Sequence, residues 1–288
     1  MAKQIKIALI QPQITYNNEK NQNQISNLIK QAVLKKPDII CLPERWYHID
    51  FPLLINSDGS IKLKNERENI FQPKQGEQYH LVQAWARKFH TPIISGGIWE
   101  KNPSDQNAII NCYYFDAEGN EKFSQNKIHL YGIEKKLASP GKNLVIFHDK
   151  QLNFKFSILI CFDLHISSYL LSQAVSHGAE MIFSPTLIRE DGINNWKIYL
   201  QARALEYRIP IASCNSVYEA FGRKFIGRSK ILTFYKGKAS PVHLKLWEMG
   251  NQAGELTQTV DLEFPNSIRQ ERVRERLDNN KIEIMDLN

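Results

Sequence analysis

The sequence has few cysteines and no arrangement of them that builds a scaffold. Its 288 residues contain four, Cys41, Cys112, Cys161 and Cys214, too few and too widely spaced for a disulfide framework in a chain of this length. None belongs to a Cys-x-x-Cys pair, so no zinc site is predicted. Each is expected to be a free thiol, which by default packs as a small hydrophobic side chain.

Long apolar runs are also missing. No stretch approaches the roughly 20 apolar residues that a membrane span requires. The amino terminus passes directly into a strand-like segment, without the apolar region of a signal peptide. These absences predict a cytoplasmic protein with no membrane partner.

The net charge of +7 does not come from a basic block. Lysines and arginines are interleaved with acidic residues, as in residues 62–68, and no basic run with stacking aromatics is present. A solvated basic surface accounts for the charge, so no nucleic-acid partner is predicted.

Apolar periodicity switches repeatedly between the strand and helix patterns along the chain. Alternation predicts a first strand over residues 5–11, and a 3.6-residue period predicts a helix that Asn17 or Asn18 caps and Pro37 ends. The same reasoning predicts further helices over 81–89, 166–175 and 194–208, and strands over 38–42, 93–99, 111–116, 122–130, 144–148, 154–160, 181–184, 210–213, 225–235 and 258–264. The pattern is typical of an α/β protein with mixed sheets and a helical outer face.

The chain contains no Gly-rich linker or compositional shift that would mark a domain boundary. One domain over residues 1–265 is therefore predicted. Residues 266–288 are charged and have little apolar periodicity, which favours an arm that crosses the surface or a partner subunit.

Three segments place a reactive side chain where a predicted strand passes into a loop, the position at which open α/β sheets gather their sites. They are Leu-Pro-Glu at 42–44, Lys-Ile-His-Leu at 127–130 and Cys-Phe-Asp at 161–163. In this order they resemble the motifs of the nitrilase superfamily of carbon–nitrogen hydrolases. The similarity extends from the first strand through Ala-Arg-Ala-Leu-Glu at 202–206 to Gly-Arg-Ser at 227–229, which is nearly the whole chain.

The resemblance implies a four-layer αββα sandwich with two mixed β-sheets, in which Glu44, Lys127 and Cys161 converge. A thiol is mostly protonated at neutral pH, so Cys161 needs a base, and Glu44 is expected to take its proton. Lys127, with the backbone N–H of Phe162, is expected to stabilise the oxyanion. Glu134 matches the second glutamate of the family and is expected to position the lysine or the substrate.

The expected reaction is hydrolysis of a small linear amide or N-carbamoyl compound through a cysteine thioester, without cofactor or metal. The Cys-Phe-Asp motif resembles the amidase and carbamoylase branches, whereas nitrilases tend to have Cys-Trp-Glu. A nitrilase is the enzymatic alternative, and a catalytically silent binding or scaffold protein is the alternative from another class. His165 stands where small-amide members often have an arginine that helps to hold a substrate carboxylate, and histidine is shorter and is charged only below about pH 6.5. A strict requirement for such a carboxylate is therefore not predicted.

Several other residues have two interpretations. The aromatic residues Trp46, Tyr47, Tyr131 and Trp196 are candidates for the pocket wall or for the core. His129 and His165 are possible partners of Cys161, although both lie outside the triad of the family. Arg203 and Glu206 are expected to form a structural ion pair, and the resemblance implies a homo-oligomer, a dimer or a multiple of dimers.

Overall fold

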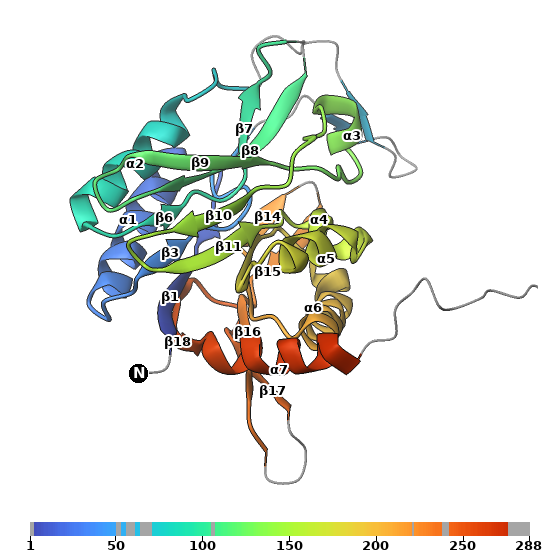
Figure 1. Cartoon of the computed structure of the whole chain (residues 1–288). Coiled ribbons are helices and arrows are strands. Elements are labelled where there is room, and N and C mark those ends of the chain that lie inside the picture. The colour runs from blue at the N-terminus through green and yellow to red at the C-terminus, as the bar shows by residue number, and fades with distance from the viewer. Residues whose placement is uncertain are drawn as a thin grey trace, which may run out of the picture.

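The computed structural model describes residues 3–49, 71–104, 107–220, 222–237 and 242–271, and the backbone alone of residues 53–55, 61–63 and 272–275. Two mixed β-sheets form its centre (Figure 1). Helices lie outside them on both sides.

The first sheet has seven strands and belongs mainly to the amino-terminal half. Its central strands β1, β3 and β6 run parallel, and the strands at both edges are antiparallel. In spatial order the strands are β18 (Gly254–Asp261), β1 (Gln4–Gln11), β3 (Ile39–Cys41), β6 (Ile93–Ile94), β8 (Ala108–Phe115) and β7 (Ile98–Lys101), with β9 (Glu121–Asn126) also paired to β8.

The second sheet has six strands and belongs to the carboxy-terminal half. Strands β11, β12 and β13 are parallel, whereas the flanking pairs are antiparallel. Its spatial order is β10 (Ile146–Asp149), β11 (Phe154–Ile158), β12 (Met181–Pro185), β13 (Ile211–Cys214), β16 (Lys230–Tyr235) and β17 (His243–Glu248).

Buried side chains define four layers. Ile7, Leu9, Phe156 and Met181 belong to one apolar cluster that joins the facing sides of the two sheets. The outer face of the first sheet packs against α1 (Asn18–Val33) and α2 (Glu77–Phe89), and the outer face of the second packs against α5 (Tyr169–Ser176), α6 (Ile193–Tyr207) and α7 (Glu263–Glu275). This arrangement confirms the predicted αββα sandwich with two mixed sheets (Figure 1).

Smaller elements complete the chain. The strands β15 (Arg223–Ile226), β14 (Val217–Ala220) and β2 (Gln13–Ile14) form a third sheet, and β4 (Leu53–Ile55) pairs with β5 (Ile61–Leu63). Short helices occur at α3 (Glu134–Leu137), α4 (Phe162–Ile166) and η1 (Glu190–Gly192).

Local signals placed most elements correctly. Asn17 caps α1, with its side chain accepting a hydrogen bond from the backbone N–H of Lys20 at 2.9 Å. The predicted helix over 166–175 begins later, at Tyr169, because α4 ends at Ile166 and the next residue, Ser167, is extended. The Ser167 hydroxyl then accepts a hydrogen bond from the N–H of Tyr169.

The single strand predicted over 93–99 is wrong, since it is interrupted between β6 and β7. Gly96 has φ +71°, and a Cβ atom there would lie 2.0 Å from the carbonyl oxygen of Pro43. The interruption therefore lets the loop after β3 approach closely.

The carboxy-terminal arm is described only in part. Residues 266–275 lie in α7, where Ile268 is buried against the second sheet, and residues 276–288 lie outside the described residues. Within the part of the chain that the structure describes, no helix is long and apolar enough to cross a membrane.

Candidate active site

Glu44 lies just beyond the carboxyl end of β3 and is almost fully buried. The backbone N–H of Leu42 donates to Ile94, and the indole N–H of Trp46 donates to the carbonyl of Ser95 at 2.7 Å. A Cβ atom on Gly97 would lie 3.0 Å from Cγ of Glu44. Hydrogen bonds on both sides of Glu44 therefore hold its loop, and Gly97 packs closely against its side chain.

Lys127 follows β9, and its side chain is only 1% exposed. Its backbone N–H donates to Ile110, and its carbonyl accepts from Gly141. Its Nζ atom lies 2.9 Å from Oε1 of Glu44 and 2.8 Å from Oε1 of Glu134. One buried cation thus joins two carboxylates that are distant in sequence.

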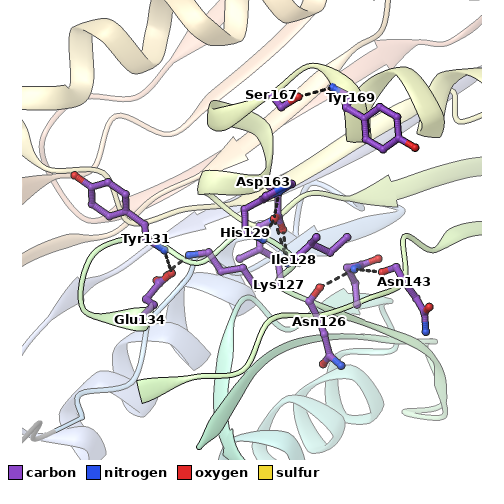
Figure 2. A network of polar contacts seen from close by, with 12 residues as sticks. Asn126, Lys127, Ile128, His129, Tyr131, Glu134, Asn143, Asp163, Ser167 and Tyr169 are labelled. Carbon is purple, nitrogen blue, oxygen red and sulfur yellow. Dashed lines mark hydrogen bonds and ion pairs between the residues drawn. The ribbon is translucent and has the colours of Figure 1, made fainter. Parts of the chain in front are cut away.

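Glu134 begins α3 and also orders the loop that leads back to Lys127. Its Oε2 atom accepts a hydrogen bond from the backbone N–H of Tyr131 at 2.8 Å, while Oε1 contacts Lys127 (Figure 2). Both oxygens are engaged, so the carboxylate holds the lysine and the loop together.

Cys161 lies at the start of α4 on a strained backbone, with φ 47° and ψ −102°. Such conformations cost about 1–3 kcal/mol in a residue other than glycine and persist only where the surroundings enforce them. Here the N–H of Cys161 donates to Pro185, and its carbonyl accepts from Leu164. The turn places the partly exposed Cys161 just beyond β11, in the manner of a strand-to-helix nucleophile turn.

Asp163 connects the cysteine turn to the lysine loop. Its buried carboxylate accepts backbone N–H bonds from Ile128 and His129, the latter at 2.6 Å, and from Ile160 at 3.2 Å. It also lies 3.2 Å from Nδ1 of His129 (Figure 2). The motif containing this residue was visible in the sequence, but its bracing role was not, because that role depends on a contact between two loops.

The charges around Cys161 determine its resting state. Burial is the main reason that the pKa of Cys161 is raised, and Glu44 raises it further, whereas Lys127 acts in the opposite direction without reversing the shift. The thiol is therefore protonated at neutral pH, and attack requires a base.

The lysine stays cationic for a different reason. Burial works to lower the pKa of Lys127, but the charges of Glu44 and Glu134 outweigh it, and the pKa is raised. Burial raises the pKa of Glu134, with Lys127 opposing the shift. The site thus contains a permanent cation beside a neutral thiol.

The remaining predicted residues lie in different environments. Phe162 stacks at a tilt against the exposed ring of Tyr131, with ring centroids 5.0 Å apart, and His165 lies beside Phe162 and Tyr199. Burial, and then Arg203, lower the pKa of His165. Trp196 is buried, and its indole N–H donates to Ser213.

The other residues with two interpretations are core or structural. Trp46 is fully buried against Trp85, whereas Tyr47 is half-buried and donates its hydroxyl hydrogen to Glu77. His129 pairs with Asp163. The predicted packing roles of the other cysteines and the predicted ion pair are confirmed, since Cys41, Cys112 and Cys214 are buried and Arg203 lies 3.3 Å from Glu206.

Arg45 directly follows Glu44, but the sequence alone does not predict a role for it in the site. It has φ 55°, and its guanidinium lies 5.9 Å from the ring centroid of Trp99. Burial lowers the pKa of Arg45, and the charges of Tyr218, Glu44 and Glu134 oppose this shift. Among the described residues, no group of three or more His, Cys, Asp or Glu side chains is arranged to hold a metal ion.

Comparisons with known proteins place the chain in a family. The family model for carbon–nitrogen hydrolases matches residues 6–238. A probable nitrilase of Schizosaccharomyces pombe is 29% identical over 197 residues, which cover 68% of each chain. An omega-amidase of Xenopus laevis is 25% identical over 289 residues, which cover 94% of this chain and 93% of the relative.

Solved structures show the same fold. Nit3 of Saccharomyces cerevisiae, a member of branch 10 of the nitrilase superfamily, superposes with a TM-score of 0.76 at 19% identity and 97% coverage of both chains. A variant of an amidase from Nesterenkonia sp. gives a TM-score of 0.72 at 21% identity, with 95% of this chain and 97% of that chain covered. That structure shows covalent addition of the acetamide moiety of fluoroacetamide at the active-site cysteine.

Proposed function

Because the chain belongs to the carbon–nitrogen hydrolase family of the nitrilase superfamily, we propose that it hydrolyses a small linear amide or N-carbamoyl compound through a thioester on Cys161. Glu44 is the general base, Lys127 binds the oxyanion, and Glu134 holds Lys127 in place. The family membership itself confirms the resemblance predicted from the three motifs.

One observation carries the proposal. Lys127 Nζ is held between carboxylate oxygens of Glu44 and Glu134 at 2.9 and 2.8 Å, and all three charges act on the Cys161 thiol. A buried cation that cannot move supplies fixed positive charge where an oxyanion would develop, and one such donor is typically worth about 3–4 kcal/mol of transition-state stabilisation. The relative named as an omega-amidase and the amidase with a modified active-site cysteine support an amide substrate.

In the first half-reaction the sulfur of Cys161 forms a bond to the carbonyl carbon while Glu44 takes the thiol proton. The carbonyl π electrons move to oxygen, where Lys127 and the N–H of Phe162 stabilise the negative charge. The intermediate then collapses, the carbon–nitrogen bond breaks, and protonated Glu44 gives its proton to the leaving nitrogen. Ammonia or an amine departs, leaving a thioester and an ionised Glu44.

In the second half-reaction Glu44 removes a proton from a water molecule, and the oxygen of that water attacks the thioester carbon. The carbon–sulfur bond breaks, the acid is released, and Glu44 returns the proton to the sulfur. The charges of Glu44 and Cys161 are therefore restored after each turnover. No step requires a redox partner.

The decisive experiment compares Cys161→Ala with Cys112→Ala. Both substitutions truncate a thiol, but Cys112 is buried between the sheets. On a panel of linear amides and N-carbamoyl compounds, the first variant should release no ammonia or amine, and the second should retain turnover if it folds by circular dichroism. Full activity of Cys161→Ala would falsify the mechanism.

Glu44→Gln tests the base separately. It keeps the shape of the side chain but cannot accept the proton, so thioester formation and hydrolysis should both slow by roughly 10²–10⁴-fold. Intact-mass spectrometry after exposure to pooled metabolites measures the acyl adduct, and its mass identifies the acyl group. An adduct that forms and clears at the wild-type rate would show that another group is the base.

A nitrilase reaction is the second candidate, favoured by the relative named as a probable nitrilase. Matched pairs of amides and nitriles that share one side chain distinguish the two reactions. Release of ammonia from the nitriles alone would replace the amidase assignment. If no pair reacted and Cys161 resisted electrophilic probes, a binding or scaffold role would be the better interpretation.

A further inference from the structure

A cavity of about 460 Å³ borders the lysine loop at the residues that follow Lys127. It is lined by the loop residues Ile128 and His129, by residues 142–146 at the start of β10, and by one side of α5 together with His177, which caps the carboxyl end of that helix. Cavities between about 300 and 1,000 Å³ are of the size that holds small molecules. The proposed reaction does not use this space.

The lining combines apolar side chains with positively charged or titratable groups. Leu144 and Leu170 contribute apolar surface, whereas Lys142, His129 and His177 contribute basic nitrogen atoms. Among the described residues, no aspartate or glutamate lines the cavity and Lys142 has no ion-pair partner. This chemistry suits a ligand with one negative charge and a short apolar body.

The two histidines are oriented by hydrogen bonds that involve Nδ1. Nδ1 of His177 lies 2.8 Å from the carbonyl oxygen of Gln173, and Nδ1 of His129 lies 3.2 Å from Oδ1 of Asp163. The hydrogen bond to Asp163 raises the pKa of His129, against the lowering effect of partial burial. A protonated His129 adds positive charge to that of Lys142.

His129 also connects the cavity to the cysteine turn. Its backbone N–H and its ring both contact Asp163, which in turn accepts the N–H of Ile160, the residue before Cys161. A carboxylate beside His129 would compete with Asp163 for the hydrogen bond of the imidazole ring. It would thereby weaken the brace between the lysine loop and the cysteine turn.

From this geometry we propose that the cavity binds a short-chain organic carboxylate, with its head group at Lys142, His129 and His177 and its chain against Leu144 and Leu170. Occupancy slows the reaction of Cys161 through the contact between His129 and Asp163. The site is therefore a regulatory one, separate from the catalytic centre.

The first experiment measures binding of hexanoate to the full-length protein by isothermal titration calorimetry, with hexanol as the uncharged probe. Binding should survive prior alkylation of Cys161 with iodoacetamide, which blocks the catalytic site. Lys142→Glu should weaken it by roughly tenfold or more, because it removes a charge-assisted hydrogen bond and adds repulsion. Lys224→Glu reverses the charge of an exposed lysine on β15 and is the matched control.

The second experiment measures how fast iodoacetamide alkylates Cys161, read by peptide mass spectrometry. Hexanoate should slow alkylation in the wild type and in Lys224→Glu, but not in Lys142→Glu. His177→Gln should weaken the effect without changing the rate in the absence of hexanoate. Binding that disappears on alkylation of Cys161, or that is equal in both lysine variants, would overturn the proposal.

The two proposals can fail separately. If Cys161 proved unreactive, the proposed hydrolysis would fail, but calorimetry on the wild type, Lys142→Glu and Lys224→Glu would still test the cavity. If turnover were confirmed and hexanoate bound only at the catalytic site, the regulatory site alone would be rejected.

Discussion

Two lysines of this protein are equally buried, and their surroundings affect them in opposite ways. The side chains of Lys127 and Lys230 are each 1% exposed. Lys127 lies between two carboxylates, and its pKa is raised even though burial works against this. For Lys230, burial is only partly opposed by Glu248, and its pKa is lowered to about 8.

The two pKa values differ because the ratio of carboxylates to cations differs between the two clusters. At Lys127 one cation contacts two carboxylates, Glu44 and Glu134. Among the described residues, one carboxylate, Glu248, is shared by three cations, Lys197, Arg228 and Lys230. The ammonium of Lys230 also donates to the carbonyl of Arg228 at 2.6 Å. Burial alone therefore does not determine the charge of a lysine; the number of acidic neighbours decides it.

The largest difference in activity is expected between two single variants that replace each lysine with methionine. Lys127→Met should lower kcat/KM by about 10²–10³ or more, because it removes the oxyanion donor and leaves Glu44 and Glu134 without their shared cation. Lys230→Met should retain turnover, since Lys230 belongs to a different charge cluster. Steady-state kinetics on one amide substrate measures both, and equal losses would show that the two clusters are not independent.

Glu134→Gln changes the ratio at Lys127 from two carboxylates to one. The pKa of Lys127 should fall, and the single amide oxygen can no longer accept from both Lys127 and the N–H of Tyr131. We expect a loss of roughly tenfold to a hundredfold in kcat, the range typical of a group that positions another, with a smaller change in KM. Glu118→Gln, at an exposed site in the turn between β8 and β9, is the control and should have no effect.

The sequence predicts a functional role for Lys127, but it contains no signal that distinguishes Lys230. Lys127 belongs to a four-residue motif that follows a strand, and Glu44 and Cys161 carry the same kind of signal. Lys230 lies within a stretch that the sequence predicted only as a strand. Its partner Glu248 comes from β17, which the apolar pattern did not reveal.

The same limit applies to the rest of the fold. Alternation and capping predicted β1 and α1, because these signals are local. The interruption at Gly96 and the brace at Asp163 depend on contacts with Pro43 and with His129, which are distant in sequence. An aromatic residue such as Trp196 suits either a pocket wall or the core. Only the packing of α6 shows that its side chain is buried.

Glu248→Gln should destabilise the fold while leaving the cation between Glu44 and Glu134 intact. It removes the carboxylate that three cations share among the described residues, and breaking a partly buried charge pair costs about 2 kcal/mol. Urea unfolding followed by circular dichroism measures the loss in the free energy of unfolding. Unchanged stability would mean that Lys197 and Arg228 are already neutralised by solvent.

The smallest effect is a dependence on pH. The folded state lowers the pKa of Lys230 from 10.5 to about 8, so between these values the unfolded chain binds more protons than the native protein. Stability from this group must therefore rise with pH across that window, and its full cost is present below about pH 8. The wild type should gain about 1 kcal/mol relative to Lys230→Met between about pH 7 and 9, as measured by parallel urea titrations. A difference that stayed constant, or that changed in the other direction, would show that Glu248 holds Lys230 as firmly as two carboxylates hold Lys127.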